Sequence, residues 1–507
     1  MRRTVFLRYP QIVIGLFAVT TFAMARLNAA DQPQWGQRHT RNMVSAETGL
    51  PDTFDPETGK NVKWSVRLGS QSYSTPVISG GKVLIGTNND EVRNPRHKGD
   101  RGVLVCLDEK DGSLCWQLVV PKLEGDIYLD WPRAGICSPA TVEGDKVYVV
   151  TNRDEVLCLD LAGQANGNDG PFRDEGRFMA PDGQPPVEVS STDADILWCF
   201  DMKTGVGMYP HDSAHASILI DGPYLYLNTC NGLDNTHHRI RAPKAPSLIV
   251  LDKTTGRLVA QDDEQIGPRI FHSTWASPSM ATAGGRKLVF FGGGDGVVYA
   301  FDPPKPSSAG DPVQKLKRVW RFDCDPTSAK EDVHRFIGNR KESPSIIKGM
   351  PVFHKDRIYV TVGGDIWWGK NEAWLKCIDA TREGDITADG QRWSYPLKQH
   401  SCATPSIADG LVYAVDCGRT LHCVDAETGQ PCWTHDLKGD MWGSTLVADG
   451  KVYVGTRRGL FWIFAAGKEK KLVAEVNLGD PISATPVAAN GTLYIATLTR
   501  LFAVAVK

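Results

Sequence analysis

A short pattern that recurs along the chain constrains the fold more than any other feature. It consists of a small residue, Ser or Thr and Pro, followed by alternating apolar residues, a Gly turn and a Val-Tyr-Val-like strand. Two degenerate copies lie at residues 215–218 and 443–445. The other copies carry the Pro, at Pro76, Pro139, Pro278, Pro344, Pro405 and Pro486. The last three copies begin about 40 residues apart, enough for four strands of ~5–6 residues with their turns.

Each copy alternates as strands do. Residues 451–456 alternate with period two, and a second apolar run follows at residues 460–464. No copy contains an amphipathic helix of about 12 residues, which excludes a parallel β/α fold. Eight copies of a small antiparallel sheet predict an all-β fold, an eight-bladed β-propeller of four-stranded antiparallel blades.

A second pattern, an apolar-x-Asp sequence with a Gly-bearing turn and then Trp, closes several copies. It is complete over residues 108–116 and 425–433. We expect Asp to cap backbone N–H groups, Gly to supply positive φ and Trp to pack against the next blade. The last copy has only about three strands, so residues 61–66, with Trp64 in the docking position, are predicted to complete that blade and close the ring.

The sequence DAETGQPCW over residues 425–433 resembles the tryptophan-docking repeat of pyrroloquinoline-quinone (PQQ) propellers. That class includes quinoprotein alcohol dehydrogenases and the assembly factor BamB. The resemblance covers roughly residues 62 to 506. Residues 244–248, 292–296 and 464–471 also resemble exported PQQ-like propellers of planctomycete-type bacteria. The resemblance implies the fold but leaves the function open.

Residues 1–30 are predicted to be a secretory signal peptide that is cleaved near residue 25 or 30. Arg2 and Arg3 precede an apolar stretch at residues 12–22, which is shorter than the ~20 residues that span a bilayer. No Cys lies near the cleavage site, so we do not expect a lipoprotein, and no other segment predicts a membrane span. We expect a periplasmic or extracellular protein with an extension over residues 31–60 and a propeller over residues 61–507.

The net charge of −2 gives the chain no bulk attraction to nucleic acid or to anionic membranes, and we expect a monomer. The 12 Cys are an even number in an exported chain, which allows disulfides. Cys106–Cys115 and Cys423–Cys432 straddle hairpins at matching positions, so each pair is either a disulfide or two buried thiols beside the Trp. No Cys spacing predicts covalent haem or structural zinc.

The innermost strand of each blade should start at a central funnel. Three positions before each Pro equivalent, the predicted ring reads Tyr73, Ile136, His215, Trp275, Lys341, Cys402, Trp442 and Ser483. Within it, Tyr73, His215, Trp275, Lys341 and Trp442 are candidates for holding a flat anionic ligand by stacking and charge. The alternative, which we favour at this stage, is that the aromatic residues simply plug the channel.

Loops between the second and third strands should open on the same face. They carry Arg153, Arg419, Arg457 and Arg458, which indicate either a basic rim for an anionic glycan or an acidic protein, or a solvated charged face.

This part of the chain is rich in histidine: His211 and His215 are four residues apart, His237 and His238 lie in an inserted loop, and His272 precedes the next blade. The carboxylates Asp212 and Asp234 are nearby in the sequence, so a metal site is an alternative. Because they match no metal-ligand spacing, we interpret them as polar loop residues and assign no metal ligand.

These features favour a binding or assembly scaffold at the cell envelope, with no catalytic residue assigned, no cofactor assigned and an unknown ligand or partner. The first alternative is a PQQ-dependent dehydrogenase holding PQQ with Ca²⁺. That class typically has adjacent cysteines over the cofactor, and the chain has no Cys-Cys pair. The second alternative is binding of an anionic polysaccharide. The role of BamB is not transferred, because insertions at residues 161–193, 231–245 and 303–318 set this chain apart.

Overall fold

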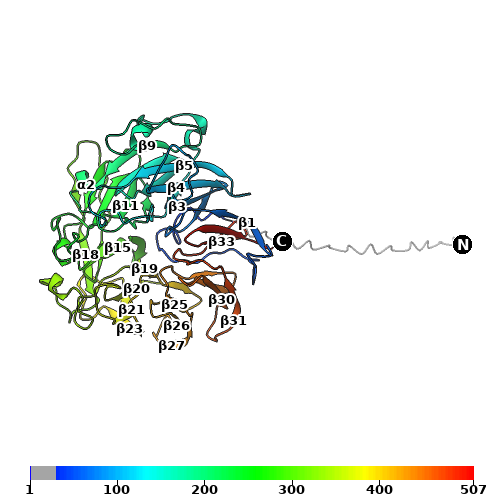
Figure 1. The fold of residues 1–507 in the computed structure, drawn as a ribbon. Coiled ribbons are helices and arrows are strands. Elements are labelled where there is room, and N and C mark those ends of the chain that lie inside the picture. Colours follow the sequence, from blue (N-terminus) through cyan, green and yellow to red (C-terminus); the bar gives the residue numbers. More distant parts are fainter. Residues whose placement is uncertain (2–29, 507) are drawn as a thin grey trace.

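The structure, a computed structural model, describes Met1 and residues 30–506, so the predicted signal peptide lies outside the described residues. Eight sheets surround a central axis (Figure 1). This arrangement confirms the predicted all-β, eight-bladed propeller. Within the described residues no helix is both long and apolar enough to cross a bilayer.

Consecutive antiparallel strands form each blade, and we number the blades along the chain. Blades 1 to 4 contain β2 (Val77–Ser79), β3 (Lys82–Asn88), β4 (Arg101–Asp108) and β5 (Leu114–Pro121); β6 (Thr141–Glu143), β7 (Lys146–Val150), β8 (Glu155–Asp160) and β9 (Asp195–Asp201); β10 (Leu219–Asp221), β11 (Tyr224–Asn228), β12 (Leu248–Asp252) and β13 (Leu258–Gln261); and β14 (Ser279–Ala283), β15 (Arg286–Gly292), β16 (Val297–Phe301) and β18 (Arg318–Asp323).

The remaining blades follow the same order. Blades 5 to 8 contain β19 (Val352–His354), β20 (Arg357–Gly363), β21 (Ala373–Asp379) and β23 (Gln391–Leu397); β24 (Ser406–Ala408), β25 (Leu411–Val415), β26 (Thr420–Asp425) and β27 (Pro431–Asp436); β28 (Leu446–Ala448), β29 (Lys451–Gly455), β30 (Leu460–Ala465) and β31 (Leu472–Asn477); and β32 (Val487–Ala489), β33 (Thr492–Ala496) and β34 (Arg500–Val504) with β1 (Val62–Arg67). The short helices within the described chain are η1 (Gly163–Asn166), α1 (Glu175–Phe178), α2 (Met202–Gly205), η2 (Gly267–Arg269) and η3 (Val333–Phe336).

Ring closure follows the prediction. Strand β1 pairs antiparallel with β34, with Trp64 opposite Ala503 and Arg67 opposite Arg500. Figure 1 shows this N-terminal strand beside the C-terminal strands of the last blade. An N-terminal strand and the C-terminal strands thus share one sheet, so the last blade is complete and the ring is closed.

Two blades carry a short fifth strand that the prediction did not include. Strand β17 (Gln314–Lys315) pairs parallel with β13, and β22 (Gly384–Asp385) pairs parallel with β18. Each comes from a loop of the following blade and covers the outer edge of the preceding one. These loops therefore protect exposed strand edges and tie neighbouring blades together.

Tryptophan side chains join neighbouring blades, as the repeat predicted. At six junctions the indole N–H donates to a backbone carbonyl of the next blade at 2.9–3.1 Å. The donors are Trp64, Trp116, Trp198, Trp320, Trp393 and Trp433. The Asp of the repeat also acts as expected, since Asp425 Oδ1 accepts from the backbone N–H groups of Glu427 and Thr428, both at 3.1 Å.

Residues 32–45, here called the axial segment, touch the inner strands of all eight blades in chain order. The contacts from blade 1 to blade 8 are Gln32 with Ile78, Pro33 with Val142, His39 with Ile220 and Met280, Thr40 with Phe353, Asn42 with Ile407, Met43 with Val447 and Ser45 with Ala488. The segment therefore makes one circuit of the axis. Sequence analysis identified it only as an extension.

Arg41 anchors the axial segment. Its side chain is fully buried and donates to the carbonyl oxygens of Trp35, Pro278 and Ser217 and to the Ser217 hydroxyl, at 2.9–3.2 Å. Burial lowers the pKa of the guanidinium to about 9. Backbone carbonyl dipoles from two blades therefore compensate a buried charge.

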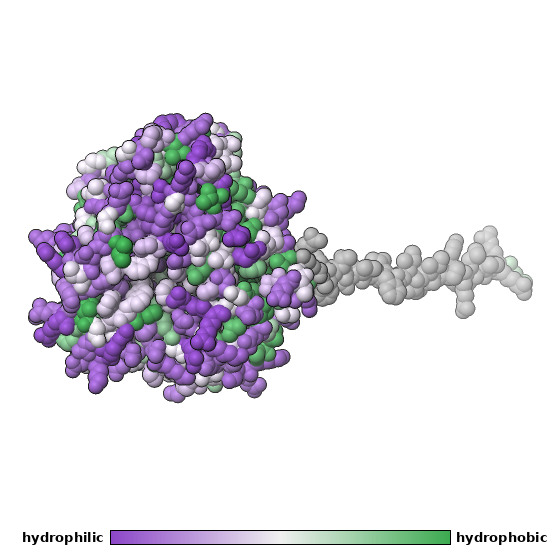
Figure 2. Space-filling view, in the orientation of Figure 1, coloured by the Kyte–Doolittle hydropathy of each residue, from purple (hydrophilic) through white to green (hydrophobic). Residues whose placement is uncertain are grey.

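The outer surface has no broad apolar patch on the face shown in Figure 2. Hydrophobic residues there are scattered among hydrophilic ones, as on ordinary soluble proteins.

The docking interaction can be tested by two glycine substitutions in blade 6. Gly429 and Gly410 both have positive φ, but a Cβ at Gly429 would lie 2.6 Å from the Trp393 ring, whereas nothing lies within 4 Å of one at Gly410. Both changes to Ala should destabilise because of the backbone conformation. Gly429→Ala should lose about 1–3 kcal/mol more by overpacking, measured by guanidinium unfolding. Equal losses would mean that the Gly–Trp contact contributes nothing.

Candidate functional site

The starts of the inner strands surround a funnel-shaped cavity of about 480 Å³. Of the five predicted ligand-binding residues in the ring, four line it, namely Tyr73, His215, Trp275 and Trp442. Cys402 and Ser483 of the predicted ring line it as well. The placement of these residues is thus as predicted, and their role in binding remains a prediction.

Lys341 and Ile136 do not line the cavity, because the Pro that marks the repeat is shifted in two blades. Strand β19 follows Pro351 and not Pro344, so Lys341 is an exposed loop residue and Lys348 takes the ring position. In blade 2, β6 begins two residues after Pro139, so Cys137 faces the cavity and Ile136 is buried behind it.

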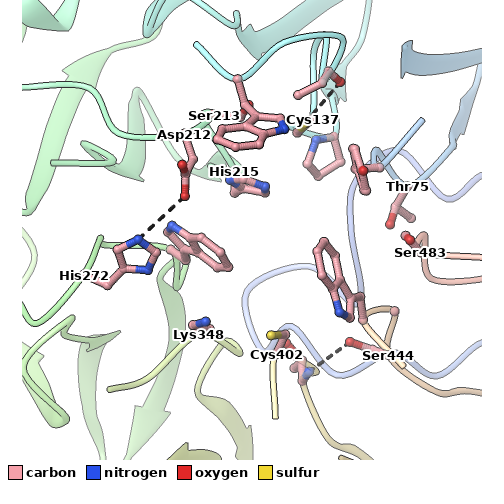
Figure 3. A pocket seen from close by; sticks show the side chains of 18 of the residues that line it. Thr75, Cys137, Asp212, Ser213, His215, His272, Lys348, Cys402, Ser444 and Ser483 are labelled. Atoms are coloured by element: carbon pink, nitrogen blue, oxygen red, sulfur yellow. Dashed lines mark hydrogen bonds and ion pairs between the residues drawn. The ribbon is translucent and has the colours of Figure 1, made fainter. Parts of the chain in front are cut away.

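With this register, the ring contains one residue from each blade. Its members are Tyr73, Cys137, His215, Trp275, Lys348, Cys402, Trp442 and Ser483. Figure 3 shows His215, Lys348, Cys402 and Ser483 placed around one central space. Counting back from the strand start, and not from the nearest Pro, would have identified all eight.

Aromatic rings line much of the wall. His215 stacks on Trp275 with ring centroids 5.0 Å apart, and Tyr73 stacks on Trp442 at 6.0 Å. Trp367, from the loop between β20 and β21, meets Trp442 edge-on at 5.9 Å. Sequence analysis missed Trp367, and also Trp35, Trp131 and Trp368, which line the cavity from the axial segment and from loops. No repeat position marks them.

Lys348 is a buried cation held between two aromatic rings and a carboxylate. Its Nζ lies 4.4 Å from the centroid of Trp275 and 4.5 Å from that of Trp367, and 2.9 Å from Asp365 Oδ2. Asp365 is fully buried, and Lys348 and His272 hold the pKa of its carboxyl well below the usual value despite that burial. The cation is therefore neutralised within the protein.

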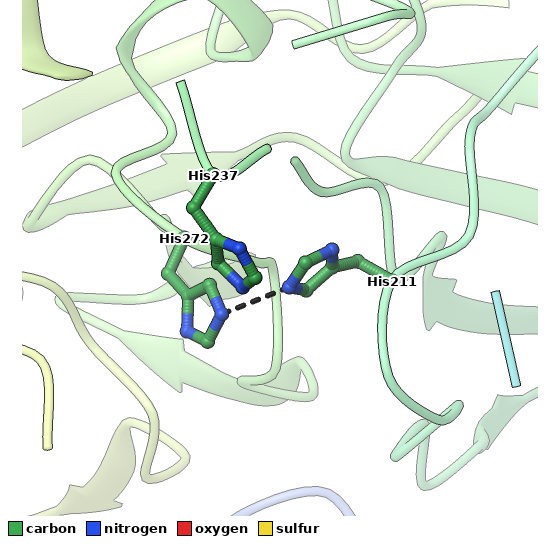
Figure 4. Close-up of side chains that lie close together, drawn as sticks. All are labelled: His211, His237 and His272. Carbon is green, nitrogen blue, oxygen red and sulfur yellow. Dashed lines mark hydrogen bonds between the residues drawn. The ribbon is translucent and has the colours of Figure 1, made fainter. Parts of the chain in front are cut away.

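Three histidines converge at the cavity wall (Figure 4). His211, His237 and His272 are buried, and each offers one ring nitrogen within 4.8 Å of the others. Burial, and next the neighbouring His272, lower the pKa of His211 to about 3. Asp212 lies beside them with Oδ2 3.8 Å from Nε2 of both His211 and His272. Sequence analysis noted all four residues but had no spacing signal that would place them together.

The four predicted rim arginines lie outside the residues that line the cavity. Three are paired with carboxylates: Arg153 with Glu155 at 3.0 Å, Arg419 with Asp436 at 3.4 Å and Arg457 with Asp440 at 3.8 Å. Arg457 also covers the Trp442 ring at 4.0 Å, and Arg458 is exposed. They form no convergent anion site.

The cysteines of both predicted disulfides are free thiols in this structure. The partners in each pair are neighbours, and hydrogen bonding to Cys106 lowers the pKa of Cys115 to about 6. A third pair, Cys402 and Cys417, lies at the cavity, where hydrogen bonding to Cys417 lowers the pKa of Cys402 to about 7. Sequence analysis did not pair these two.

The cavity does not fit PQQ with Ca²⁺. Calcium takes 6–8 oxygen ligands, several of them carboxylates, whereas Asp212 is the only carboxylate among the residues that line the cavity. The nearby cation, Lys348, is neutralised by Asp365. The donor set therefore matches neither the ion nor the charge of the cofactor.

The role of Lys348 can be tested by comparing it with Lys341, the lysine that was predicted from the sequence to line the funnel. Lys348→Met leaves the buried Asp365 without its cation and should cost about 3 kcal/mol of unfolding free energy. Lys341→Met, at an exposed position, should change it by less than about 0.5 kcal/mol. Guanidinium unfolding of both variants measures the difference, and similar values for the two would contradict this account.

Comparisons with known proteins agree with the fold. Residues 317–498 match the family model described as outer membrane protein assembly factor BamB. BamB from Moraxella catarrhalis is similar in structure, with 14% identity, a TM-score of 0.52, and 87% of this chain and 96% of that chain covered.

Quinohemoprotein alcohol dehydrogenases are similar as well. The enzyme ADHIIG from Pseudomonas putida HK5 has 12% identity and a TM-score of 0.57, with 94% of this chain and 80% of that chain covered. The enzyme from Comamonas testosteroni has 13% identity and a TM-score of 0.54, with 95% and 82% covered. No curated protein sequence matches the chain significantly. Residues 317–498 thus match the BamB family model, and the chain as a whole shares the β-propeller fold of BamB and of quinohemoprotein alcohol dehydrogenases.

Proposed function

We propose that the protein is an exported binding scaffold of the cell envelope that holds a neutral sugar-like ligand in its funnel. The observation that carries this proposal is the pairing of open aromatic faces with unpartnered polar atoms in one cavity. Export rests on the N-terminal sequence, and a scaffold role agrees with the likeness to an assembly factor.

Five polar side-chain atoms of residues that line the funnel have no hydrogen-bond partner within the described protein. They are the indole nitrogens of Trp275 and Trp442, the hydroxyls of Ser213 and Ser483, and Nδ1 of His215. A buried polar group without a partner costs about 1–3 kcal/mol, and native proteins leave few such groups. Five of them belong to residues around one cavity, and a ligand with several hydroxyl groups would satisfy them after small side-chain shifts that expose these atoms.

The aromatic faces favour a ring with an apolar side. Trp131 and Trp367 line the same cavity and remain 40% and 37% exposed, so a ligand can reach them without rearrangement. A sugar ring offers both a C–H face that can pack on an indole and hydroxyl groups at its edge. Apolar walls with a few fixed polar groups are the usual composition of small-ligand sites.

The charges favour a neutral ligand over an anionic polysaccharide. Lys348 is paired with Asp365, and three of the four rim arginines are paired with carboxylates. An anionic chain would have to compete with these internal partners. The poor fit to PQQ and Ca²⁺ likewise favours binding over quinone-dependent oxidation.

The proposal can be tested with the full chain on an array of neutral and acidic oligosaccharides, followed by calorimetry with the best neutral trisaccharide. Trp442→Ala should weaken binding roughly tenfold or more, because large buried aromatic residues dominate such contacts. The control is Trp374→Ala, since Trp374 on β21 does not line the funnel.

Three results would contradict the proposal. They are no binding to any oligosaccharide by the folded protein, binding that Trp442→Ala does not weaken, or binding confined to acidic sugars and lost at high salt. Stoichiometric binding of PQQ in the presence of Ca²⁺ would instead favour a PQQ-dependent dehydrogenase.

A further inference from the structure

We infer that His211, His237, His272 and Asp212 form a binding site for a divalent first-row transition metal ion at the wall of the funnel. This site does not depend on the proposed sugar ligand. His211 and Asp212 lie in the connection from blade 2 to blade 3, His237 lies between β11 and β12, and His272 lies in the connection from blade 3 to blade 4.

Two of the ligand atoms already lie close enough to share one ion, and one ring nitrogen from each of the three histidines lies within 4.8 Å of the other two. Nε2 of His211 and Nε2 of His272 are 2.9 Å apart. With metal–nitrogen bonds of 2.0–2.1 Å, two imidazoles on one ion are separated by roughly 3.0–3.4 Å. Asp212 Oδ2 is 3.8 Å from both nitrogens, so a shift of about half an ångström brings it to the ~3.4 Å of tetrahedral ligands.

The hydrogen bonds of the rings determine which nitrogens are free. His211 Nδ1 is 2.7 Å from the carbonyl oxygen of Leu233, which can only accept, so this Nδ1 carries a hydrogen. His272 Nδ1 is 3.1 Å from Oδ2 of Asp365, a carboxylate oxygen that accepts, so this Nδ1 donates as well. The two Nε2 atoms that face each other therefore both present lone pairs.

Two lone pairs at 2.9 Å repel unless a positive charge lies between them. A shared proton is one such charge, held beside the carboxylates of Asp365 and Asp212, but it engages only two of the three rings. A metal ion accepts both lone pairs, and His237 adds a third. The same face-to-face arrangement that is unfavourable in the empty protein becomes favourable with the ion bound.

The surroundings have the form of a metal site's outer shell. Metal-ligating histidines usually donate their other N–H to a carbonyl or carboxylate, as His211 and His272 do here. Asp365 is itself fixed, because its Oδ1 accepts from the backbone N–H groups of Trp367 and Trp368, both at 2.9 Å. The ring orientations are therefore set before any ion arrives.

The backbone supports these positions at a cost. Asp212 and His237 both have positive φ, 64° and 58°, a conformation that is uncommon for residues other than glycine. Gly232 passes so close to His211 that an added Cβ would lie 2.6 Å from the His211 Cβ. Such strain clusters at functional sites.

The donor set selects the class of ion. Imidazole nitrogens suit Zn²⁺, Cu²⁺, Ni²⁺ and Fe²⁺, whereas Ca²⁺ and Mg²⁺ need several oxygen ligands, of which this cluster offers only the carboxylate of Asp212. His237, His272 and Asp212 also line the funnel, so one side of the ion would face a bound ligand. Figure 3 shows Asp212 and His272 facing each other across this wall.

The test uses the full chain without a polyhistidine tag, stripped with chelator. After incubation with Zn²⁺ and desalting, mass spectrometry should find about one zinc per chain, and Co²⁺ should give the visible absorption of a nitrogen-ligated ion. His272→Ala and His237→Ala should each lose stoichiometric binding, whereas Asp365→Asn should weaken it roughly 10–100-fold. The control is His354→Ala, at the end of β19, which should bind as the parent does.

Circular dichroism identifies variants that fail to fold, and His237→Ala is the safer of the two ligand variants because His237 lies in the loop between β11 and β12. The inference is overturned if the folded parent retains no zinc, if His237→Ala and His272→Ala both retain one equivalent, or if excess Ca²⁺ displaces the zinc. Because zinc content is measured without any sugar, failure here leaves the proposed sugar binding untouched, and the reverse also holds.

Discussion

The structure depends on the contact between neighbouring blades, because no blade can bury its two apolar faces by itself. Each sheet is only about four strands wide, and its buried residues belong to clusters shared with the next blade. The tryptophan N–H bond to a carbonyl across the junction adds direction to this packing. Strand β1 completes blade 8 beside β34, and its Trp64 contacts blade 1, so the same contact between blades closes the ring.

Most of the fold could be predicted because the same short sequence pattern recurs in most of the blades. The Asp turn, the positive φ at Gly429 and the docking of Trp433 each follow from elementary chemistry. The route of residues 32–45 could not be predicted in this way. It belongs to no repeat, and its contacts, such as Arg41 with Ser217, join positions 176 residues apart that carry no shared pattern.

The residues that line the funnel could be predicted only in those blades where the Pro of the repeat marks the start of the inner strand. In blade 5 the Pro of the repeat does not directly precede the inner strand, so Lys341 was predicted at the ring position that Lys348 occupies. The expected chemistry, a cation beside aromatic rings, is nevertheless present. The histidine cluster could not be predicted from the repeat. His211 and His272 are 61 residues apart and meet only because consecutive blades bring their connecting loops together.

The circuit of the axial segment has a consequence for how the protein is made. The part of the chain that leaves the ribosome first has its partners distributed over every later blade, the last of them at Ala488 and Gly491. Early blades can form as they are synthesised, but the hub at the centre and the shared last sheet must wait for the final residues. A chain that ended before blade 8 would leave Ser45 and Glu47 without their partners and β1 without β34.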